Sequence, residues 1–198
     1  VWDRFARKYV ASPISDVPTY ERKLELTRKY LRPDMNVLEF GCGSGNTARL
    51  QAPRVASYTA MDISAKMIEH GRAEGPVPEN MHYEVGDFAT AEVAPESYDM
   101  ILALSVLHVL PDPAAVVRKV AGALKPGGYF VSSTVPIGEF GLLSILAPVG
   151  GALGIIPKLS RLSSDGIRAL MTDNGLTILE DWRPDPKAAL FLVAQKPA

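Results

Sequence analysis

The sequence has few of the residues that mark disulfide frameworks, metal centres and nucleic-acid surfaces. Cys42 is the single cysteine among 198 residues, so no internal disulfide can form. The three histidines are scattered and none has zinc-ligand spacing to a cysteine, so no metal is expected. With 21 basic and 22 acidic residues the net charge is −1, and no long Lys/Arg block is present. A nucleic-acid partner is therefore not expected.

The sequence predicts neither a secretory leader nor a clear membrane span. No charged-then-apolar segment opens it, so a cytoplasmic location is expected. Residues 140–156 carry no charge, but four glycines and Pro148 interrupt them, and a span needs about 20 apolar residues. We expect no stable span, with transient membrane contact as an alternative. The length and the 47% hydrophobic content fit one domain, either a monomer or a homodimer.

The most informative pattern is an apolar strand that ends in an acid and enters a glycine-rich turn. Residues 37–40 lead into Gly41-Cys42-Gly43-Ser44-Gly45. Glycines at alternate positions allow a sharp turn and let a ligand approach the backbone, while the next helix offers free N–H groups. A dinucleotide loop would read G-x-G-x-x-G, but here Asn46 takes the last glycine's position. The turn predicts a nucleotide-like cofactor and leaves an NAD-type cofactor as an alternative.

Strand and helix patterns alternate along the rest of the chain. This order predicts an α/β doubly wound, Rossmann-like sheet of seven strands, mostly parallel, with helices on both faces and a C-terminal antiparallel strand. The predicted strands are 36–40, 57–61, 81–85, 98–104, 129–135, 176–182 and 189–196, and the predicted helices are 19–31, 46–52, 65–73, 113–124 and 163–173.

Polar residues follow two of the predicted strands. Asp62, after the second strand, could accept hydrogen bonds from both hydroxyls of a ribose, or could cap the next helix. Ile63 could cover one face of an adenine, and Met67 is a secondary candidate. After the third strand, Asp87 could accept the adenine amino hydrogens while Phe88 borders the base. Taken alone, these last two residues would predict a turn and a core aromatic.

Five motifs occur in order between residues 36 and 135. They are E-x-G-x-G-x-G at 39–45, Asp62, Gly86-Asp87-Phe88, a strand from Tyr98-Asp99 to Leu107-His108, and L-K-P-G-G at 124–128. Together they resemble the class I S-adenosylmethionine-dependent methyltransferases, in particular the small-molecule, ubiquinone-biosynthesis-like group. The resemblance covers about half of the chain.

The resemblance implies methyl transfer from S-adenosyl-L-methionine to a small, apolar or aromatic acceptor by direct displacement, leaving S-adenosyl-L-homocysteine. Two alternatives stay open: an NAD-type oxidoreductase, and a module that binds S-adenosylmethionine without catalysis. No Asn/Asp-Pro-Pro-Tyr/Phe tetrapeptide follows the fourth strand, so amino groups of DNA are not expected as acceptors. The implied cofactor-binding residues are Glu39, Phe40, Gly41, Cys42, Gly43, Gly45, Asp62, Ile63, Met67, Asp87, Phe88, Ala103, Leu104 and Ser105.

Catalytic acid–base side chains are less marked in the sequence. His108, Tyr9 and Tyr20 are the candidates. Within a single domain, we expect residues 1–33 to form a helical lid, 34–135 the cofactor-binding core, 136–160 an apolar insert or lid, and 161–198 the last helix and strand pair. The insert is expected to contact the substrate, with a dimer interface or membrane contact as alternatives.

Overall fold

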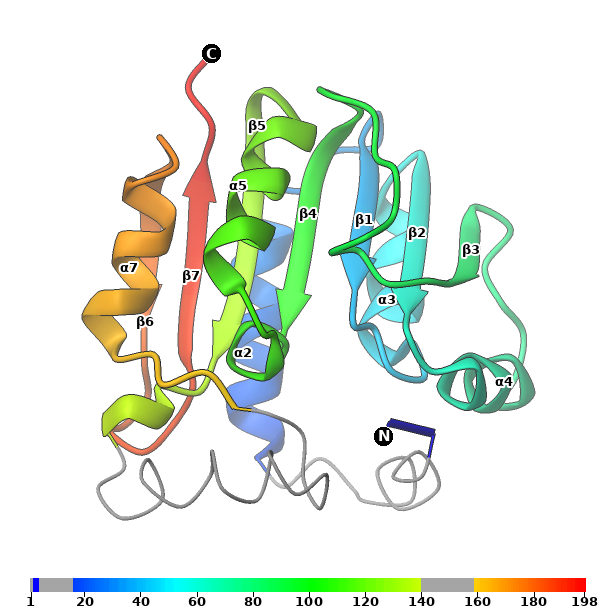
Figure 1. The fold of residues 1–198 in the computed structure, drawn as a ribbon. Helices are drawn as coiled ribbons and strands as arrows, with labels where there is room; N and C mark the ends of the chain where they lie inside the picture. The colour runs from blue at the N-terminus through cyan, green and yellow to red at the C-terminus, as the bar shows by residue number, and fades with distance from the viewer. Residues whose placement is uncertain (1, 4–15, 140–158) are drawn as a thin grey trace.

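A computed structural model describes residues 2–3, 16–139 and 159–198, and a seven-stranded sheet forms its centre (Figure 1). The strand order is β3-β2-β1-β4-β5-β7-β6. Strands β1 to β5 are parallel, whereas β7 runs antiparallel to both β5 and β6. The predicted doubly wound sheet is thus confirmed. The strands are β1 (Asn36–Phe40), β2 (Ser57–Asp62), β3 (Met81–Val85), β4 (Tyr98–Leu104), β5 (Leu124–Thr134), β6 (Thr177–Trp182) and β7 (Leu190–Gln195).

Helices cover both faces of the sheet and enclose two apolar cores. On one face, α2 and α3 bury Leu26 and Ala48 against strand residues such as Tyr58. On the other, α5 and α7 bury Val117 and Ile167, and these two helices lie in front of the sheet in Figure 1. The helices are α2 (Val17–Arg28), α3 (Asn46–Gln51), α4 (Ala65–Ala73), α5 (Pro113–Ala123) and α7 (Ser164–Thr172), with short 3-10 turns η1 (Ala52–Arg54), η2 (Leu107–Val109) and η3 (Ile137–Glu139).

Several element boundaries differ from the sequence-based expectation by one to five residues, and two of these differences have a visible physical cause. Helix α2 begins two residues earlier than predicted because the Asp16 carboxylate accepts the Thr19 N–H at 3.0 Å and Pro18 fits the first turn. Strand β5 begins at Leu124 rather than Tyr129. Its early part remains in the sheet because the Gly128 carbonyl accepts the N–H of Lys196 at 2.9 Å. The L-K-P-G-G motif therefore continues a strand as well as ending a helix.

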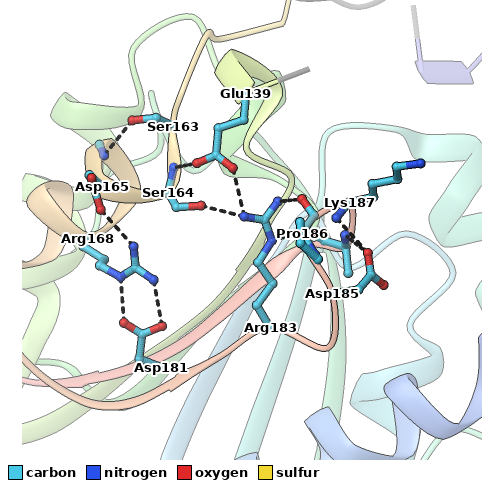
Figure 2. A network of polar contacts seen from close by, with 12 residues as sticks. Glu139, Ser163, Ser164, Asp165, Arg168, Asp181, Arg183, Asp185, Pro186 and Lys187 are labelled. Atoms are coloured by element: carbon cyan, nitrogen blue, oxygen red, sulfur yellow. Dashed lines mark hydrogen bonds and ion pairs between the residues drawn. The ribbon is translucent and has the colours of Figure 1, made fainter. Parts of the chain in front are cut away.

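A polar network fastens the last helix to the turn between β6 and β7 (Figure 2). The Arg183 guanidinium donates to Glu139 Oε2 and to Ser164 Oγ, both at 2.9 Å, and also to the carbonyls of Pro186 and Ala188. Glu139 Oε1 accepts the Ser164 N–H at 2.6 Å, so one carboxylate joins η3 to the start of α7. These hydrogen bonds lower the pKa of Glu139 to about 2.

Candidate active site

A pocket of about 840 Å³ opens at the carboxyl ends of β1, β2 and β4. Its volume is near the upper end of the range of roughly 300–1,000 Å³ that is usual for small-molecule sites. The strand order reverses between β1 and β4, and this is where a doubly wound sheet leaves a crevice. Ten of the fourteen predicted cofactor-binding residues line the pocket: Phe40, Gly41, Gly43, Asp62, Ile63, Met67, Asp87, Phe88, Leu104 and Ser105.

The glycine turn has a backbone that only glycine adopts without strain. Gly41, Gly43 and Gly45 have φ values of +66°, +59° and +82°. A Cβ on Gly41 would lie 2.4 Å from Val106 Cγ2, and one on Gly45 would lie 2.5 Å from the Tyr83 hydroxyl oxygen. Val106 and Tyr83 thus pack closely on the turn, and Gly41 and Gly43 line the pocket. Such a backbone suits a bulky cofactor that must come close to the chain.

Asp62 braces this turn and also faces the pocket. Its Oδ2 accepts the Gly43 N–H and its Oδ1 accepts the Ser64 N–H, both at 2.8 Å. Only 8% of the residue is exposed, and burial raises the pKa of its carboxyl group. Each carboxylate oxygen can accept a second hydrogen bond, so the group can still bind ligand hydroxyls. The helix-capping role belongs to Ser64, whose Oγ accepts the Met67 N–H.

Apolar side chains beside Asp62 form one wall of the pocket. Ile63 is 56% exposed, which is unusual for a large apolar residue, whereas Met67 is buried. The Phe40 and Phe88 rings stack with their centroids 4.4 Å apart and their planes at 7°. Asp87 is half-buried, and its Oδ1 accepts the Ala89 N–H at 2.9 Å. This wall can take a flat apolar ring, with a carboxylate nearby for an amino group.

The end of β4 turns sharply into the pocket. Ser105 has a φ of +62°, which non-glycine residues seldom adopt, and its N–H donates to the Ser133 carbonyl at 2.7 Å. Leu104 and Ser105 line the pocket, whereas Ala103 is fully buried one position earlier. The hydrogen bond to Ser133 on the neighbouring strand stabilises this unfavourable backbone conformation of Ser105.

Three further predicted residues lie behind the pocket wall or away from it. Glu39 is 2% exposed, accepts the Tyr58 hydroxyl at 2.7 Å, and burial raises its pKa to about 7. Cys42 and Gly45 belong to the turn but are not among the lining residues. Burial raises the pKa of the Cys42 thiol, which therefore stays protonated at neutral pH and is a poor nucleophile.

Of the two acid–base candidates that lie within the described residues, His108 lines the pocket and Tyr20 does not. Burial lowers the pKa of His108 to about 4, and its Nδ1 is buried without a hydrogen-bond partner among the described residues. The Ser160 N–H donates to the His108 carbonyl at 2.8 Å, and the Ser160 hydroxyl donates to the Leu110 carbonyl, which holds the η2 turn. The Tyr20 hydroxyl lies 3.1 Å from Thr47 Oγ1, outside the pocket lining.

Two predictions fall on parts of the chain outside the described residues. Tyr9 lies within residues 4–15, and most of the predicted apolar insert lies within residues 140–158. Within the described ranges, no three or more His, Cys, Asp and Glu side chains are grouped to hold a metal ion. No helix in these ranges is both long and apolar enough to cross a membrane.

Most residues on the side of the pocket that follows β4 were not among the predicted site residues. This side follows β4 and continues into the first turn of α5, with no polar pattern that would mark it as a binding surface. An apolar run after a strand predicts core packing equally well. Trp2 was not among the predicted site residues, although it lies within residues 1–33, which were expected to form a lid. The additional lining residues are Trp2, Gly86, Ala89, Thr90, Val106, Val109, Leu110, Pro111, Asp112, Ala115 and Val116.

Comparison with known families agrees with this fold. A family model described as a methyltransferase domain matches residues 7–181, so the chain belongs to the methyltransferase domain family. Within that family it is a class I, S-adenosylmethionine-dependent methyltransferase domain, as the five motifs predicted. The family favours this assignment over the NAD-type oxidoreductase.

Individual relatives cover different shares of the chain. A ubiquinone biosynthesis O-methyltransferase of Paracidovorax citrulli is 32% identical over 125 residues, which are 62% of this chain and 52% of that protein. The chain thus spans about half the length of this curated relative. Among solved structures, the YcgJ protein of Bacillus subtilis has a TM-score of 0.74 at 19% identity, covering 90% of this chain and 99% of its own. An S-adenosylmethionine-dependent methyltransferase of Mesorhizobium loti has a TM-score of 0.69 at 22% identity, covering 87% and 96%. At these identities the solved structures show the fold alone.

Proposed function

We propose that this chain transfers the methyl group of S-adenosylmethionine to a hydroxyl group of a small, largely apolar acceptor. The observation that carries the proposal is a single pocket in which the residues fitted to a nucleoside adjoin an apolar wall that contains His108. The relatives named as ubiquinone biosynthesis O-methyltransferases support a hydroxyl acceptor.

The proposed cofactor half is the region around the glycine turn. The backbone of Gly41 and Gly43 would lie against the cofactor, Asp62 would accept hydrogen bonds from the ribose hydroxyls, and Asp87 would accept from the adenine amino group. When bound, the cofactor supplies a methyl group that is activated by its sulfonium. The remaining predicted contacts, from Glu39, Cys42, Gly45 and Ala103, would act by holding the shape of the turn and strand ends.

The proposed acceptor half is the apolar surface near η2. Val109, Leu110 and Pro111 line it beside His108, with no lysine or arginine among the lining residues. Removing water and aligning the two reactants would supply much of the rate enhancement. An acceptor with a flat apolar body and a hydroxyl group, such as a phenol, fits this lining.

His108 is the proposed hydrogen-bond partner of the acceptor hydroxyl. With its pKa lowered to about 4 the imidazole is neutral at pH 7, so one ring nitrogen is free to accept a hydrogen bond. A base this weak cannot deprotonate a phenol of pKa about 10 in advance. The hydroxyl becomes much more acidic as its oxygen gains the methyl group, and His108 would take the proton at that stage.

Calorimetry and methyl-transfer assays together test the proposal. S-adenosylhomocysteine should bind and NAD(H) should not, and labelled methyl from S-adenosylmethionine should appear on phenols, catechols or hydroquinones rather than on matched amines or thiols. Binding of the cofactor without transfer to any of these acceptors would favour the non-catalytic module. Transfer confined to amines or thiols would refute the hydroxyl assignment.

His108→Gln separates the proposed catalytic role from cofactor binding. We expect kcat to fall by about 10²-fold or more, as for loss of a general base, while the affinity for S-adenosylhomocysteine stays within about twofold. His82→Gln is the control, because His82 is exposed on β3. Equal rates for the His108 variant and the wild-type enzyme would remove His108 from the mechanism. Tyr20→Phe and Tyr9→Phe test the other two candidates.

The setting of the enzyme is part of the same proposal. We propose a cytoplasmic monomer or homodimer without a nucleic-acid partner, supported by the lone Cys42 and the near-zero net charge. Cell fractionation, light scattering and a gel-shift assay test these three points.

A further inference from the structure

The second and third residues of the chain lie beside the start of α4 (Figure 1). The Trp2 side chain lines this pocket together with Ile63 and Met67. Its neighbour Asp3 contacts the start of α4: the Asp3 Oδ1 accepts the Ser64 hydroxyl at 2.5 Å and the Lys66 N–H at 3.4 Å. A segment more than sixty residues away in sequence is thus fastened beside the proposed adenosine position.

The Asp3 contact suits the chemistry of a helix start. Ser64 is the N-cap of α4, and its Oγ already accepts the Met67 N–H at 3.2 Å. Asp3 accepts the Lys66 N–H, which has no acceptor within the helix because it lies in the first turn. Asp3 also places a negative charge at the positive end of the helix. Both effects favour the docked position of Asp3.

The same serine connects Asp3 to the glycine turn. The Ser64 N–H donates to Asp62 Oδ1, and Asp62 Oδ2 accepts the Gly43 N–H. A continuous series of hydrogen bonds therefore runs from Asp3 through Ser64 and Asp62 to Gly43. Anything that shifts Ser64 also shifts a hydrogen-bond donor to the Asp62 carboxylate, which is proposed to bind the ribose.

We propose that Trp2 and Asp3 form a clasp on the cofactor: Trp2 covers the adenosine against Ile63, and Asp3 holds Trp2 in place by docking on Ser64 and Lys66. Trp2 is a binding residue and Asp3 a positioning residue that acts through it. The inference rests on the S-adenosylmethionine site assigned above. An indole can stack on a flat purine, and only a docked segment presents it to the pocket. The clasp must open for the cofactor to leave, so its loss should speed dissociation more than it slows association.

Stopped-flow and calorimetric measurements with S-adenosylhomocysteine test the clasp. We expect Trp2→Ala and Asp3→Ala each to raise the dissociation rate about tenfold. The double variant should release the ligand no faster than Trp2→Ala alone, because both changes remove one clasp. The matched control is Asp16→Ala, which also removes an exposed aspartate that caps a helix, but on α2 and outside the pocket lining.

A second measurement reports on Trp2 directly. In a Trp182→Phe background Trp2 is the remaining tryptophan, since the chain has two. Its emission should change when S-adenosylhomocysteine binds. Asp3→Ala should reduce this change, whereas Ser64→Thr, which keeps the hydroxyl that Asp3 accepts, should leave it as in the wild-type protein.

The outcomes separate the clasp from the cofactor assignment. If the wild-type protein binds S-adenosylhomocysteine but both single variants release it at the wild-type rate, the clasp is refuted and the cofactor site stands. If Asp3→Ala acts as strongly in the Trp2→Ala background as alone, Asp3 does not act through Trp2 and the proposal is wrong. If the wild-type protein does not bind the ligand at all, both assignments fail.

Discussion

The Tyr58 hydroxyl donates a 2.7 Å hydrogen bond to the Glu39 carboxylate within the core on the α2 side of the sheet. Both residues are nearly inaccessible to solvent, and they are diagonal neighbours on the adjacent strands β2 and β1, since Tyr58 pairs with Val37 and Glu39 with Ala60. Burial raises the pKa of Glu39 to about 7 and outweighs the effect of the tyrosine donor. Glu39, the acid that begins the glycine motif, is therefore buried in an environment that disfavours its charged form.

The raised pKa of Glu39 predicts that stability falls as the pH rises toward 7. Between pH 4.5 and about pH 7 the folded protein keeps a proton on Glu39 that the unfolded chain has lost, so the free energy of unfolding decreases with pH across that window. The full effect is on the order of 3 kcal/mol. Glu39→Gln should remove this slope in urea titrations at several pH values, since its amide oxygen can still accept from Tyr58. A slope unchanged in Glu39→Gln would assign the pH dependence to another group.

Asp62→Asn should weaken cofactor binding more than it weakens the fold. The change replaces a charged carboxylate by a neutral amide. The carboxylate oxygens accept the Gly43 and Ser64 N–H groups and are proposed to accept the ribose hydroxyls. We expect a loss of about 1.5–3 kcal/mol in S-adenosylhomocysteine binding by calorimetry, with the two-state unfolding transition retained. Asp112→Asn is the control, because Asp112 also lines the pocket and asparagine caps α5 equally well. Equal affinities of the two variants for S-adenosylhomocysteine would contradict the proposed hydrogen bonds between Asp62 and the ribose.

Gly41→Ala should destabilise the turn through backbone strain and through contact with Val106. A positive φ costs about 1–2 kcal/mol for alanine, and the added Cβ would lie 2.4 Å from Val106 Cγ2. Overpacking of this kind adds about 1–3 kcal/mol. In a double-mutant cycle measured by urea unfolding, Val106→Ala should remove the cost of overpacking and leave the cost of the positive φ. Gly122→Ala is the control: it lies in α5 with open space around it and should stabilise by up to about 1 kcal/mol. Additive effects of Gly41→Ala and Val106→Ala would contradict the contact.

The Arg183 network should make the protein sensitive to acid. Glu139 has a lowered pKa of about 2, so its contribution to stability is present above pH 4.5 and is lost as the pH falls toward 2. Arg183→Met should lower the free energy of unfolding by about 1–3 kcal/mol at pH 7 and by much less at pH 2, because it leaves Glu139 without its cation. Arg22→Met, which breaks the exposed pair with Glu25, should change stability by less than about 0.5 kcal/mol. Equal losses for the two variants would show that Arg183 is not a structural brace.

Element boundaries were predicted well where a local sequence signal, such as a helix-capping serine, sets them. Ser64 and Ser163 accept helix N–H groups as N-caps, so α4 begins at the predicted residue and α7 one residue after it, and strands β3 and β4 have the predicted bounds. The beginning of β5 was not predicted, because proline and glycine locally favour a break. Pairing with the last strand, about seventy residues later, keeps this segment in the sheet.

The sequence by itself determined the family, the order of strands and helices, and the residues of the glycine turn, because each depends on short spacings and on backbone freedom that only glycine provides. The tertiary structure decided which of those residues meet. It placed Glu39 behind the turn with Tyr58, brought His108 rather than Tyr20 to the pocket, and joined Asp3 to Ser64. Such contacts depend on which face of a strand points to a core and on segments far apart in sequence, and local patterns do not encode either.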